Sequence, residues 1–487
     1  MRQIKWTRRR VLQSAGGVVA AMALPARPAK AAVSEVMTRL STYMSEAAGT
    51  NLPAEAVEKA KQHILDTFAA MISGADLPPG RVALNFAKAH MGEKVATVAA
   101  SSIVCGPIEA AMANGMLAHS DETDDSHALS HCHPGCAMVP AALAAGEQFG
   151  IDGTRFLRAV TLGYDVGPRV TMTLGGLPYQ MESHRSTHSV ASTFGAAAAA
   201  ACAAGLNAQQ MRWVLDYASQ QASGIVAWQR DTDHIEKSLV FAGMPARNGV
   251  SAALLIQLGG TGVDDVFSGA DNFLMAWAPK ADPGTLIDKL GQRFEVAQTN
   301  IKKWTVGSPI QAPLDALVNI RKRHPFEADQ VQKVVIRLAT SEAKTVNNRE
   351  MPDISLQHMV AVMLTDKTAS FASAHDKPRM QEAGILRQRA KVELVTDEEL
   401  EKQYPMRESI VEVTFNDGTK QTERVNAVRG TIDNPMTREE VVEKSRDLMT
   451  PVLGAAVCAK LIETVLNIES VKNIRDLRPL LQRQKEA

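Results

Sequence analysis

Apolar residues recur at every third or fourth position from residue 34 to about residue 280, in segments that end at glycine. This spacing is typical of amphipathic helices. The segment "PAEAVEKAKQHILDTFAAMISG" (residues 53–74) stops at Gly74, as a helix with a glycine cap would. "FGAAAAAACAAG" (residues 194–205) is rich in small side chains, which favours a buried helix packed closely against its neighbours. A further helix is predicted to begin at Asn207, a residue type that commonly caps helices.

The pattern changes near Pro283. "VQKVVIRLAT" (residues 331–340) alternates and is β-branched. "ESIVEVTFNDGTKQTERV" (residues 408–425) places two strand-like runs around Asn-Asp-Gly, which is a strong hairpin signal. After Asn434-Pro435 the helical spacing returns and continues to about Leu481.

A chain of 487 residues is too long for a single hydrophobic core. We therefore predict a mainly α fold, in which both ends of the chain build one all-helical domain (residues 34–282 and 436–487). A smaller α+β lid domain is inserted at residues 283–435.

The first 31 residues have the features of an export signal. Arg8 and Arg9 precede a weakly apolar run, and "AKA" (residues 29–31) offers a cleavage site. This pattern resembles a twin-arginine signal peptide and predicts a periplasmic or secreted protein. A basic tail without a targeting role is the alternative.

Removal of this segment changes the charge of the protein. The whole chain has 53 basic and 53 acidic residues, and residues 1–31 hold seven basic residues and no acidic one. The mature chain would then carry a net charge of −7, which argues against nucleic acid or an anionic membrane as a partner. We expect no transmembrane helix after the signal, and the five cysteines do not indicate a disulfide framework.

The densest chemistry lies in "AHSDETDDSHALSHCHPGC" (residues 118–136), which holds four His, two Cys and four carboxylates. Three interpretations are open from the residues alone. The stretch is a polar loop, a general acid/base site in which carboxylates tune histidine, or a zinc site. The zinc ligands would be His131, Cys132, His133 and Cys136, although their spacing fits no standard zinc template.

Several motifs together resemble the 2-methylcitrate dehydratase/cis-aconitate decarboxylase superfamily, also called MmgE/PrpD. They are "NGMLAHSDETDDSH", "HPGC", "VPAALAAGEQFG" and "AVTLGYDVGPRV". Members typically show H-x-x-D-F-D-D-T, then H-P-[GS], then a G-Y-E-V helix. The resemblance implies a helical domain with an inserted lid, and proton transfer on a small polycarboxylate without a metal or organic cofactor. It also implies a homodimer formed through the helical domain.

The family's acid/base residues map onto this sequence unevenly. His133 matches the H-P-[GS] histidine, and Asp124 and Ser126 fall within the D-D-T segment. Glu122 stands where the family has an aspartate, and its longer side chain could still serve as a base or hydrogen-bond partner. The resemblance therefore implies that His133 is the leading acid/base, with Asp124 and Glu122 as tuners or a second base.

Other catalytic candidates lie farther along the chain. A second family histidine, before the Ala-rich segment, corresponds to His184 or His188, and we favour His188. A structural role in capping that helix is the alternative. Lys237 in "HIEKSLVFAG" matches the family's catalytic lysine.

The candidate substrate-binding residues are Arg247, Lys302, Lys303, Gln311 and His358. Arg247 could hold a carboxylate with two parallel hydrogen bonds, or form a salt bridge within the helical domain. In the lid, Gln311 stands where the family has histidine and His358 where it has tyrosine, which points to a changed substrate or reaction. We predict a 2-methylcitrate dehydratase-like lyase or isomerase, with a carboxylate-binding protein without turnover and a zinc enzyme as alternatives.

Overall fold

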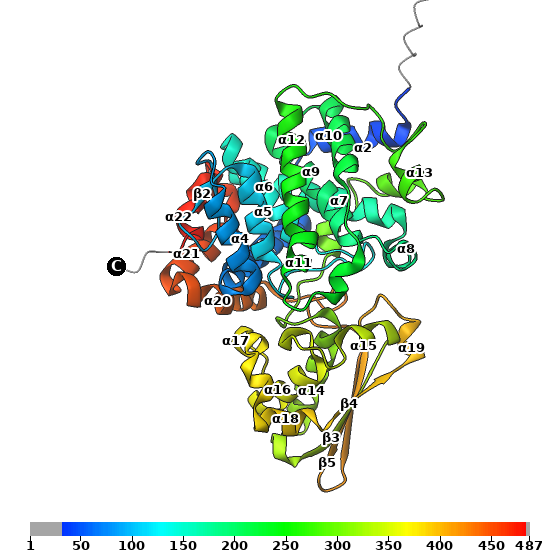
Figure 1. Ribbon diagram of the computed structural model, residues 1–487, viewed down its shortest axis with the longest axis vertical. Helices are drawn as coiled ribbons and strands as arrows, with labels where there is room; N and C mark the ends of the chain where they lie inside the picture. Colours follow the sequence, from blue (N-terminus) through cyan, green and yellow to red (C-terminus); the bar gives the residue numbers. More distant parts are fainter. Residues whose placement is uncertain (1–31, 484–487) are drawn as a thin grey trace, which may run out of the picture.

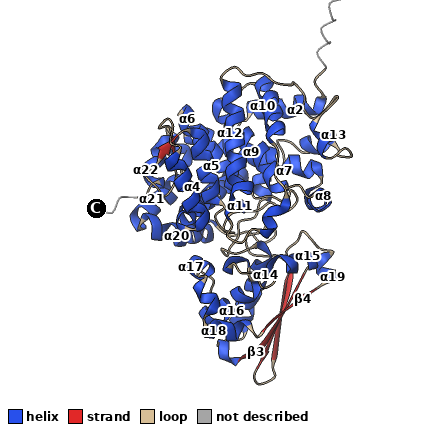
Figure 2. Ribbon diagram, viewed as in Figure 1, coloured by secondary structure: helices blue, strands red, loops and turns tan. Residues whose placement is uncertain are grey.

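The computed structural model describes residues 32–483, and the predicted signal peptide at residues 1–31 lies outside this range. The protein is mainly helical, as predicted, and carries a small mixed sheet toward its C-terminus (Figures 1 and 2). The part predicted to be all-helical also contains a short antiparallel pair of strands, β1 (Ala96–Thr97) and β2 (Val104–Cys105). Two separate hydrophobic cores organise it. The first core includes residues from Met37 to Ile301 and again from Met436 to Leu481; we call this part the body. The second includes residues from Trp304 to Val428, which we call the cap.

The body is built around an Ala-rich central helix, α9 (Thr187–Ala204). All its residues up to Ala203 are buried, and it packs against α6, α7, α10 and α12. Small side chains let these helices approach closely, which confirms the buried helix predicted from the alanine run. The body helices before the cap are α2 (Glu35–Glu46), α3 (Ala54–Ser73), α4 (Pro78–Ala89), α5 (Pro107–Ala118), α6 (Gly135–Phe149), α7 (Gly153–Leu174), α8 (Gly176–Ser183), α10 (Ala208–Gln221), α11 (Ile235–Ser238), α12 (Met244–Gln257) and α13 (Phe273–Trp277).

The sequence predicted a cap at one end of each of two helices, and the structure confirms the cap at Asn207 but shows no left-handed glycine cap at Gly74. Asn207 caps α10 with a reciprocal hydrogen-bond pair to Gln210, as its position predicted. Helix α3 ends before Gly74, but the φ of Gly74 is −69°, so this glycine does not adopt a left-handed cap. A β-carbon there would lie 2.3 Å from the carbonyl oxygen of Leu117. Close approach of α5, and not backbone conformation, therefore requires glycine at this position.

The C-terminal helices return to the body, where they pack against its N-terminal part (Figure 1). They are α20 (Arg438–Leu453), α21 (Ala455–Leu466) and α22 (Arg478–Leu481). On α20, the Lys444 ammonium donates to Asp66 of α3 at 2.6 Å and to the carbonyl of Thr123 at 2.9 Å. Both side chains of the Lys444–Asp66 pair are buried. This lysine thus joins the last long helix to α3 and to the loop after α5.

The cap combines a four-stranded sheet with short helices. The strand order is β4-β3-β5-β6, with β3 and β4 parallel and the other pairs antiparallel. The predicted hairpin is confirmed, because β5 and β6 flank the Asn416-Asp417-Gly418 turn. The cap elements are α14 (Ser308–Arg323), β3 (Val331–Leu338), α15 (Thr340–Val346), α16 (Leu356–Asp366), α17 (Phe371–His375), α18 (Ala383–Arg389), β4 (Val392–Thr396), α19 (Glu398–Glu401), β5 (Ser409–Phe415) and β6 (Lys420–Val425).

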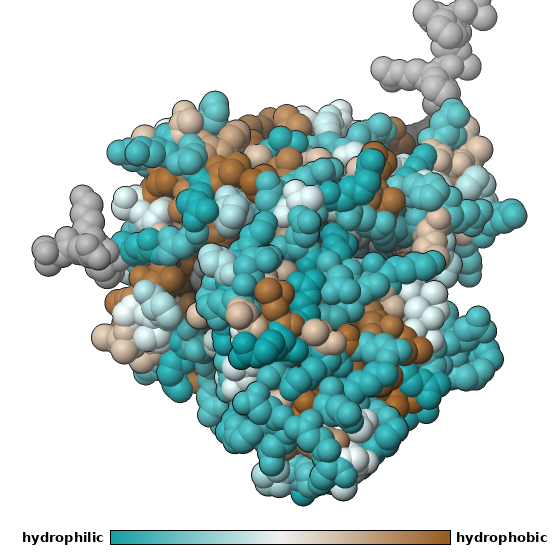
Figure 3. Space-filling model, turned by 60° about the horizontal axis from the view of Figure 1, so that its bottom comes forward, coloured by the Kyte–Doolittle hydropathy of each residue, from teal (hydrophilic) through white to brown (hydrophobic). Residues whose placement is uncertain are grey.

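One continuous helical stretch, Ile235–Gln257, is long and apolar enough by composition to cross a membrane. However, 61% of its most apolar window is buried inside the protein, where α12 packs against α5 and α9. Core helices of this kind are often as apolar as membrane spans. Hydrophilic side chains cover most of the face seen in Figure 3, and the hydrophobic patches between them are small.

We predict that Lys444→Met lowers the free energy of unfolding by about 3–5 kcal/mol, because Asp66 is left as a buried carboxylate without its ammonium. Denaturant unfolding followed by circular dichroism measures the change. The matched control is Lys460→Met, which removes an exposed pair with Glu463 and should change stability by about 1 kcal/mol or less. Equal stability of the two variants would contradict the structural role of Lys444.

Candidate active site

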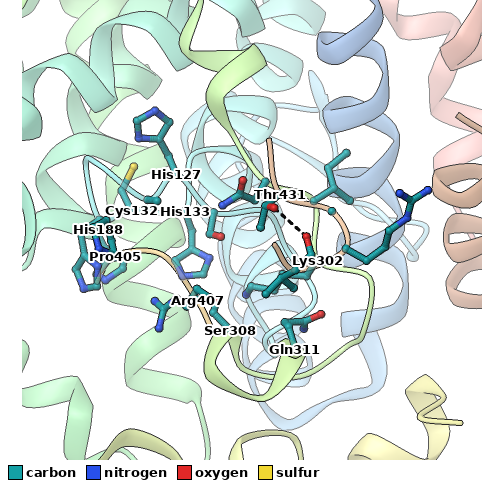
Figure 4. Close-up of a pocket in the computed structure, with 18 residues that line it drawn as sticks. His127, Cys132, His133, His188, Lys302, Ser308, Gln311, Pro405, Arg407 and Thr431 are labelled. Atoms are coloured by element: carbon teal, nitrogen blue, oxygen red, sulfur yellow. Dashed lines mark hydrogen bonds between the residues drawn. The ribbon is translucent and has the colours of Figure 1, made fainter. Parts of the chain in front are cut away.

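A cavity of about 70 Å³ lies where the body meets the cap. One water needs roughly 10–15 Å³ measured in this way, so the space admits a small molecule. Figure 4 shows body histidines and Arg407 on one side of the view, with Lys302 and Gln311 on the other. The cavity therefore combines residues that are far apart in the sequence. The lining residues that matter most for chemistry are His131, His133, His188, Lys302, Gln311 and Arg407.

Asp125 fixes the loop that carries His133. Its carboxylate accepts hydrogen bonds from the backbone N–H of Gly135 at 2.9 Å, from the Tyr164 hydroxyl at 2.6 Å and from His63 Nδ1 at 2.8 Å. A β-carbon at position 135 would lie 2.5 Å from Thr67 Oγ1 and 2.7 Å from the Tyr164 oxygen. Glycine is therefore required at the start of α6, and His133, two residues earlier, is held at the cavity wall.

Behind His133 lies a buried carboxylate flanked by two imidazoles. Asp124 accepts a hydrogen bond from His119 Nδ1 at 2.9 Å, and its other oxygen lies 3.3 Å from His133 Nδ1. Burial alone would raise the pKa of Asp124, but His119, His133 and Lys302 hold it well below its usual value. Burial lowers the pKa of His133, and Asp124 only partly offsets this. His133 is therefore a neutral imidazole beside an ionised carboxylate near neutral pH.

Glu122 is the second buried carboxylate, and it binds two lysines. Lys237 Nζ donates to Glu122 Oε1, while Lys302 Nζ donates to its backbone oxygen at 2.9 Å and lies 3.4 Å from Oε2. Lys302 also lies 3.6 Å from Asp124. Burial opposes ionisation of Glu122, but the two ammonium groups keep its pKa well below the usual value. Three predicted residues, Glu122, Lys237 and Lys302, thus form one charge cluster with Asp124.

The structure distinguishes the two candidate histidines on either side of the α9 start. His188 lies in the first turn of α9, is buried and stacks on Phe241 with ring centroids 3.9 Å apart. Its ring lies 5.2 Å from that of His133, and burial keeps its pKa well below the usual value. His184 ends α8 and is exposed. His188 is therefore the histidine that the fold brings to His133.

The other predicted residues occupy varied positions. Ser126 lines the cavity and pairs through its backbone with Asn300. Gln311 also lines the cavity, but its amide is engaged by the backbone of Trp304 and Val306 at 2.7–3.0 Å.

Three predicted substrate-binding residues lie apart from the charge cluster. Arg247 is exposed and donates to the neighbouring Asn248. Lys303 lies over the ring of Trp304 at 4.6 Å. His358 is fully buried in α16 inside the cap, where burial lowers its pKa to about 4.

Two sets of potential metal ligands come together among residues 32–483. They are His119, Asp124 and His133, and His119, Glu122 and His234, with ligand atoms within 4.8 Å of one another in each set. The ammonium groups of Lys237 and Lys302 contact the same carboxylates and would repel a divalent cation. The donor set therefore fits a proton-transfer and anion site better than a metal site.

The zinc ligands considered from the sequence, among them Cys132 and Cys136, are a different set from these two groups of potential metal ligands. Cys132 contacts Ser130 at 3.0 Å, and Cys136 donates to the carbonyl of His133 at 3.1 Å. Within residues 32–483, neither thiol belongs to a set of three or more side chains whose ligand atoms converge, so the geometry does not support this zinc site.

Sequence reasoning missed three residues of this region, His119, His234 and Arg407, and considered His131 only as a zinc ligand. His119 could have been found, because it opens the quoted histidine–carboxylate stretch five residues before Asp124. His234 lies three residues before Lys237 in a motif that was used only for its lysine. No local pattern marks Arg407, which follows a cap turn and reaches the cavity only in the folded protein.

The sequence matches two protein-family domains. Residues 38–285 match the MmgE/PrpD N-terminal domain and residues 304–470 match the MmgE/PrpD C-terminal domain.

Curated relatives extend over nearly the same length. The chain is 25% identical over 482 residues to the cis-aconitate decarboxylase-like protein oryM of Aspergillus oryzae, covering 92% of this chain and 97% of that protein. It is 24% identical over 483 residues to cis-aconitate decarboxylase of Aspergillus terreus, covering 93% and 96%. Identity to cis-aconitate decarboxylase of Homo sapiens is 25% over 450 residues, covering 88% and 90%.

An ion pair between cap and body lies next to this site. His375, at the end of α17, places Nε2 3.0 Å from Asp121 in the body. Burial opposes its protonation, but Asp121 and Asp353 raise the pKa of His375 to about 9. Burial raises the pKa of Asp353 to about 6, so this carboxylate is ionised above that pH.

We predict that the free energy of unfolding falls as the pH rises from about 6.5 to 9. Folded His375 keeps its proton up to pH of about 9, whereas an unfolded histidine loses it near 6.5, so the native state binds more protons in this window. The expected loss is on the order of 3 kcal/mol. Denaturant midpoints across this range should show a shallower slope for His375→Gln than for the parent. The exposed control His324→Gln should keep the parent slope, and identical slopes in all three proteins would exclude the contribution of His375.

Proposed function

The chain belongs to the MmgE/PrpD family, and we propose that it is a lyase or isomerase that moves a proton next to a carboxylate of a small di- or tricarboxylate. The names of its relatives specify decarboxylation of cis-aconitate, a small tricarboxylate. Dehydration and epimerisation need the same first event, removal or delivery of a proton beside a carboxylate. The proposal rests on one observation above all. A buried, neutral His133 backed by Asp124 lines the same cavity as Lys302.

His133 has the properties of a general base. His133 Nδ1 lies 3.3 Å from Asp124, and in the neutral tautomer that carries its hydrogen on this nitrogen the lone pair is on Nε2. When Nε2 takes a proton, the positive charge forms beside the Asp124 carboxylate, which stabilises it. His188 is also neutral and close by, so it is suited to return or relay a proton. These two histidines provide the acid/base pair of the proposed reaction.

The lysines stabilise the negative charge that develops on the substrate in the proposed reaction. Removing a proton next to a carboxylate builds negative charge on that carboxylate, and a fixed ammonium placed there lowers the barrier. Lys302 lines the cavity and is buried, so its charge acts in a medium of low polarity. Lys237 and Glu122 hold Lys302 within a charge-balanced cluster. No metal or organic cofactor is part of this proposal.

A second candidate is a carboxylate-binding protein without turnover. The observation in its favour is that Glu122 and Asp124 already balance the charges of Lys237 and Lys302, which weakens the effect of the lysines on a transition state. Exchange of the α-proton in deuterated water, followed by NMR across a panel of small di- and tricarboxylates, separates the two functions. An enzyme exchanges at least one acid catalytically, whereas a binding protein binds acids without exchange.

We predict that His133→Asn lowers kcat by about 10²- to 10⁴-fold and changes substrate affinity by less than about tenfold. Asparagine retains hydrogen bonding but cannot take up a proton near neutral pH, and the lysine anchors remain. Turnover and binding are measured on the acid that exchanges fastest with the parent. The control His90→Asn alters an exposed histidine of the body and should leave both values unchanged. Normal turnover by His133→Asn together with loss in His188→Asn would reverse the two roles.

We also propose, from the sequence alone, that the precursor is exported through the twin-arginine route and that the mature protein is periplasmic or secreted. A homodimer formed through the body is proposed on the same family resemblance, and light scattering tests it.

We predict that replacing Arg8 and Arg9 together by Lys retains the precursor in the cytoplasm, because the arginine pair is the recognition element of such a signal. Cell fractionation with an antibody against the mature chain measures the distribution. Replacement of Arg2, which lies outside the pair, is the control and should not affect export. Export of the doubly substituted precursor would refute this localisation.

A further inference from the structure

Three cationic side chains line the cavity, and they differ in what they already bind. Arg429 places its guanidinium on both carboxylate oxygens of Glu440 and on Asn434 at 2.7 Å. Lys302 is bound to Glu122 and lies beside Asp124. Arg407 is the third, and it reaches the cavity from the segment of the cap that precedes β5.

Arg407 is anchored at one end and retains donors at the other. One terminal nitrogen donates to Glu342 of α15 at 2.7 Å, and the guanidinium carbon lies 5.2 Å from the ring centre of Tyr404. An arginine has five N–H donors, arranged in a planar fork that matches a carboxylate. The contact with Glu342 fixes the direction of this fork and leaves donors for a ligand. Gln311 cannot take the same role, because its amide is engaged by backbone groups.

Arg407 lies close to the row of histidines. Burial lowers the pKa of His131 to about 3, and the positive charge of Arg407 contributes to this shift. The ring of His131 is 4.8 Å from that of His188, which in turn is 5.2 Å from that of His133. Figure 4 shows Arg407 beside His133 and His188, with Lys302 on the other side of the view.

We propose that Arg407 binds a second carboxylate of the substrate, distinct from the one next to the carbon that gains or loses the proton. This inference rests on the proposed function and narrows it. In this arrangement Lys302 holds the carboxylate next to the reacting carbon, and Arg407 holds the distal carboxylate. The site therefore selects short-chain molecules with at least two carboxylates. Because Lys302 directly precedes the cap and Arg407 lies within it, such a ligand also tethers the cap to the histidines of the body.

The test compares succinate with butyrate, which have the same four-carbon chain but two and one carboxylates. We expect the parent protein to bind succinate at least tenfold more tightly than butyrate by isothermal titration calorimetry. Arg407→Gln should weaken succinate binding at least tenfold and butyrate binding less than twofold. Arg407→Lys keeps the charge but loses the fork, and its succinate affinity should lie between the two. Arg424→Gln, which removes an exposed arginine paired with Glu408 on the cap sheet, is the control and should bind like the parent.

Because Arg407→Gln leaves the buried Glu342 without its partner, the double variant Arg407→Gln/Glu342→Gln is measured as well. The same selective loss of succinate in both variants excludes a folding defect as its cause. Equal losses for succinate and butyrate, or no loss for either, would overturn the role of Arg407. Proton exchange on a diacid by the parent, together with unchanged diacid preference in Arg407→Gln, refutes this inference alone. Absence of both binding and exchange in the parent refutes the proposed function with it.

Discussion

The buried charges of Glu122 and Asp124 impose the constraint on which the site depends. An ionised carboxylate in the interior is costly unless a cation and hydrogen bonds compensate it. Here the compensation comes from Lys237, which lies in α11, and from Lys302, which directly precedes the cap. Three segments that are far apart in the sequence must meet for these charges to be tolerated.

A second network positions the chemistry around this cluster. Asp125 ties the Gly135 amide, Tyr164 and His63 together, and Lys444 holds the carbonyl of Thr123 from the C-terminal helix. The loop between α5 and α6 is thus fixed by helices from both ends of the chain. His131 and His133 of this loop line the cavity. This rigidity is what an acid/base site requires, since proton transfer depends on short and well-aligned contacts.

The cavity lies between two cores, which has consequences for catalysis. The body provides neutral histidines, and the cap provides Arg407. Neither part contains the whole site, so a substrate that contacts both lowers the free energy of their association. The neighbouring His375–Asp121 pair joins the same two parts. Substrate binding and the docking of the cap are therefore physically linked in this arrangement.

The sequence by itself determined the elements and the reactive loop. Helical spacing, the alanine run, the Asn207 cap and the Asn-Asp-Gly turn are local signals, and the corresponding elements follow them. His133, Glu122 and Lys237 were identified because each stands at a position that matches a motif of the MmgE/PrpD family. Side chains that belong to a helix start or a tight turn keep their direction whatever the distant chain does.

Only the tertiary structure decided which of the remaining residues meet. His188 rather than His184 lies beside His133, and Lys302 rather than Lys303 reaches the charge cluster. A shift of a few residues changes the direction of a side chain on a helix or loop. Arg247 and His358 lie elsewhere, since their helices present those positions to solvent or to the cap core. Arg407 has no local signal at all. Its role follows from the packing of the cap against the body, and contacts between distant segments leave no spacing pattern in a single sequence.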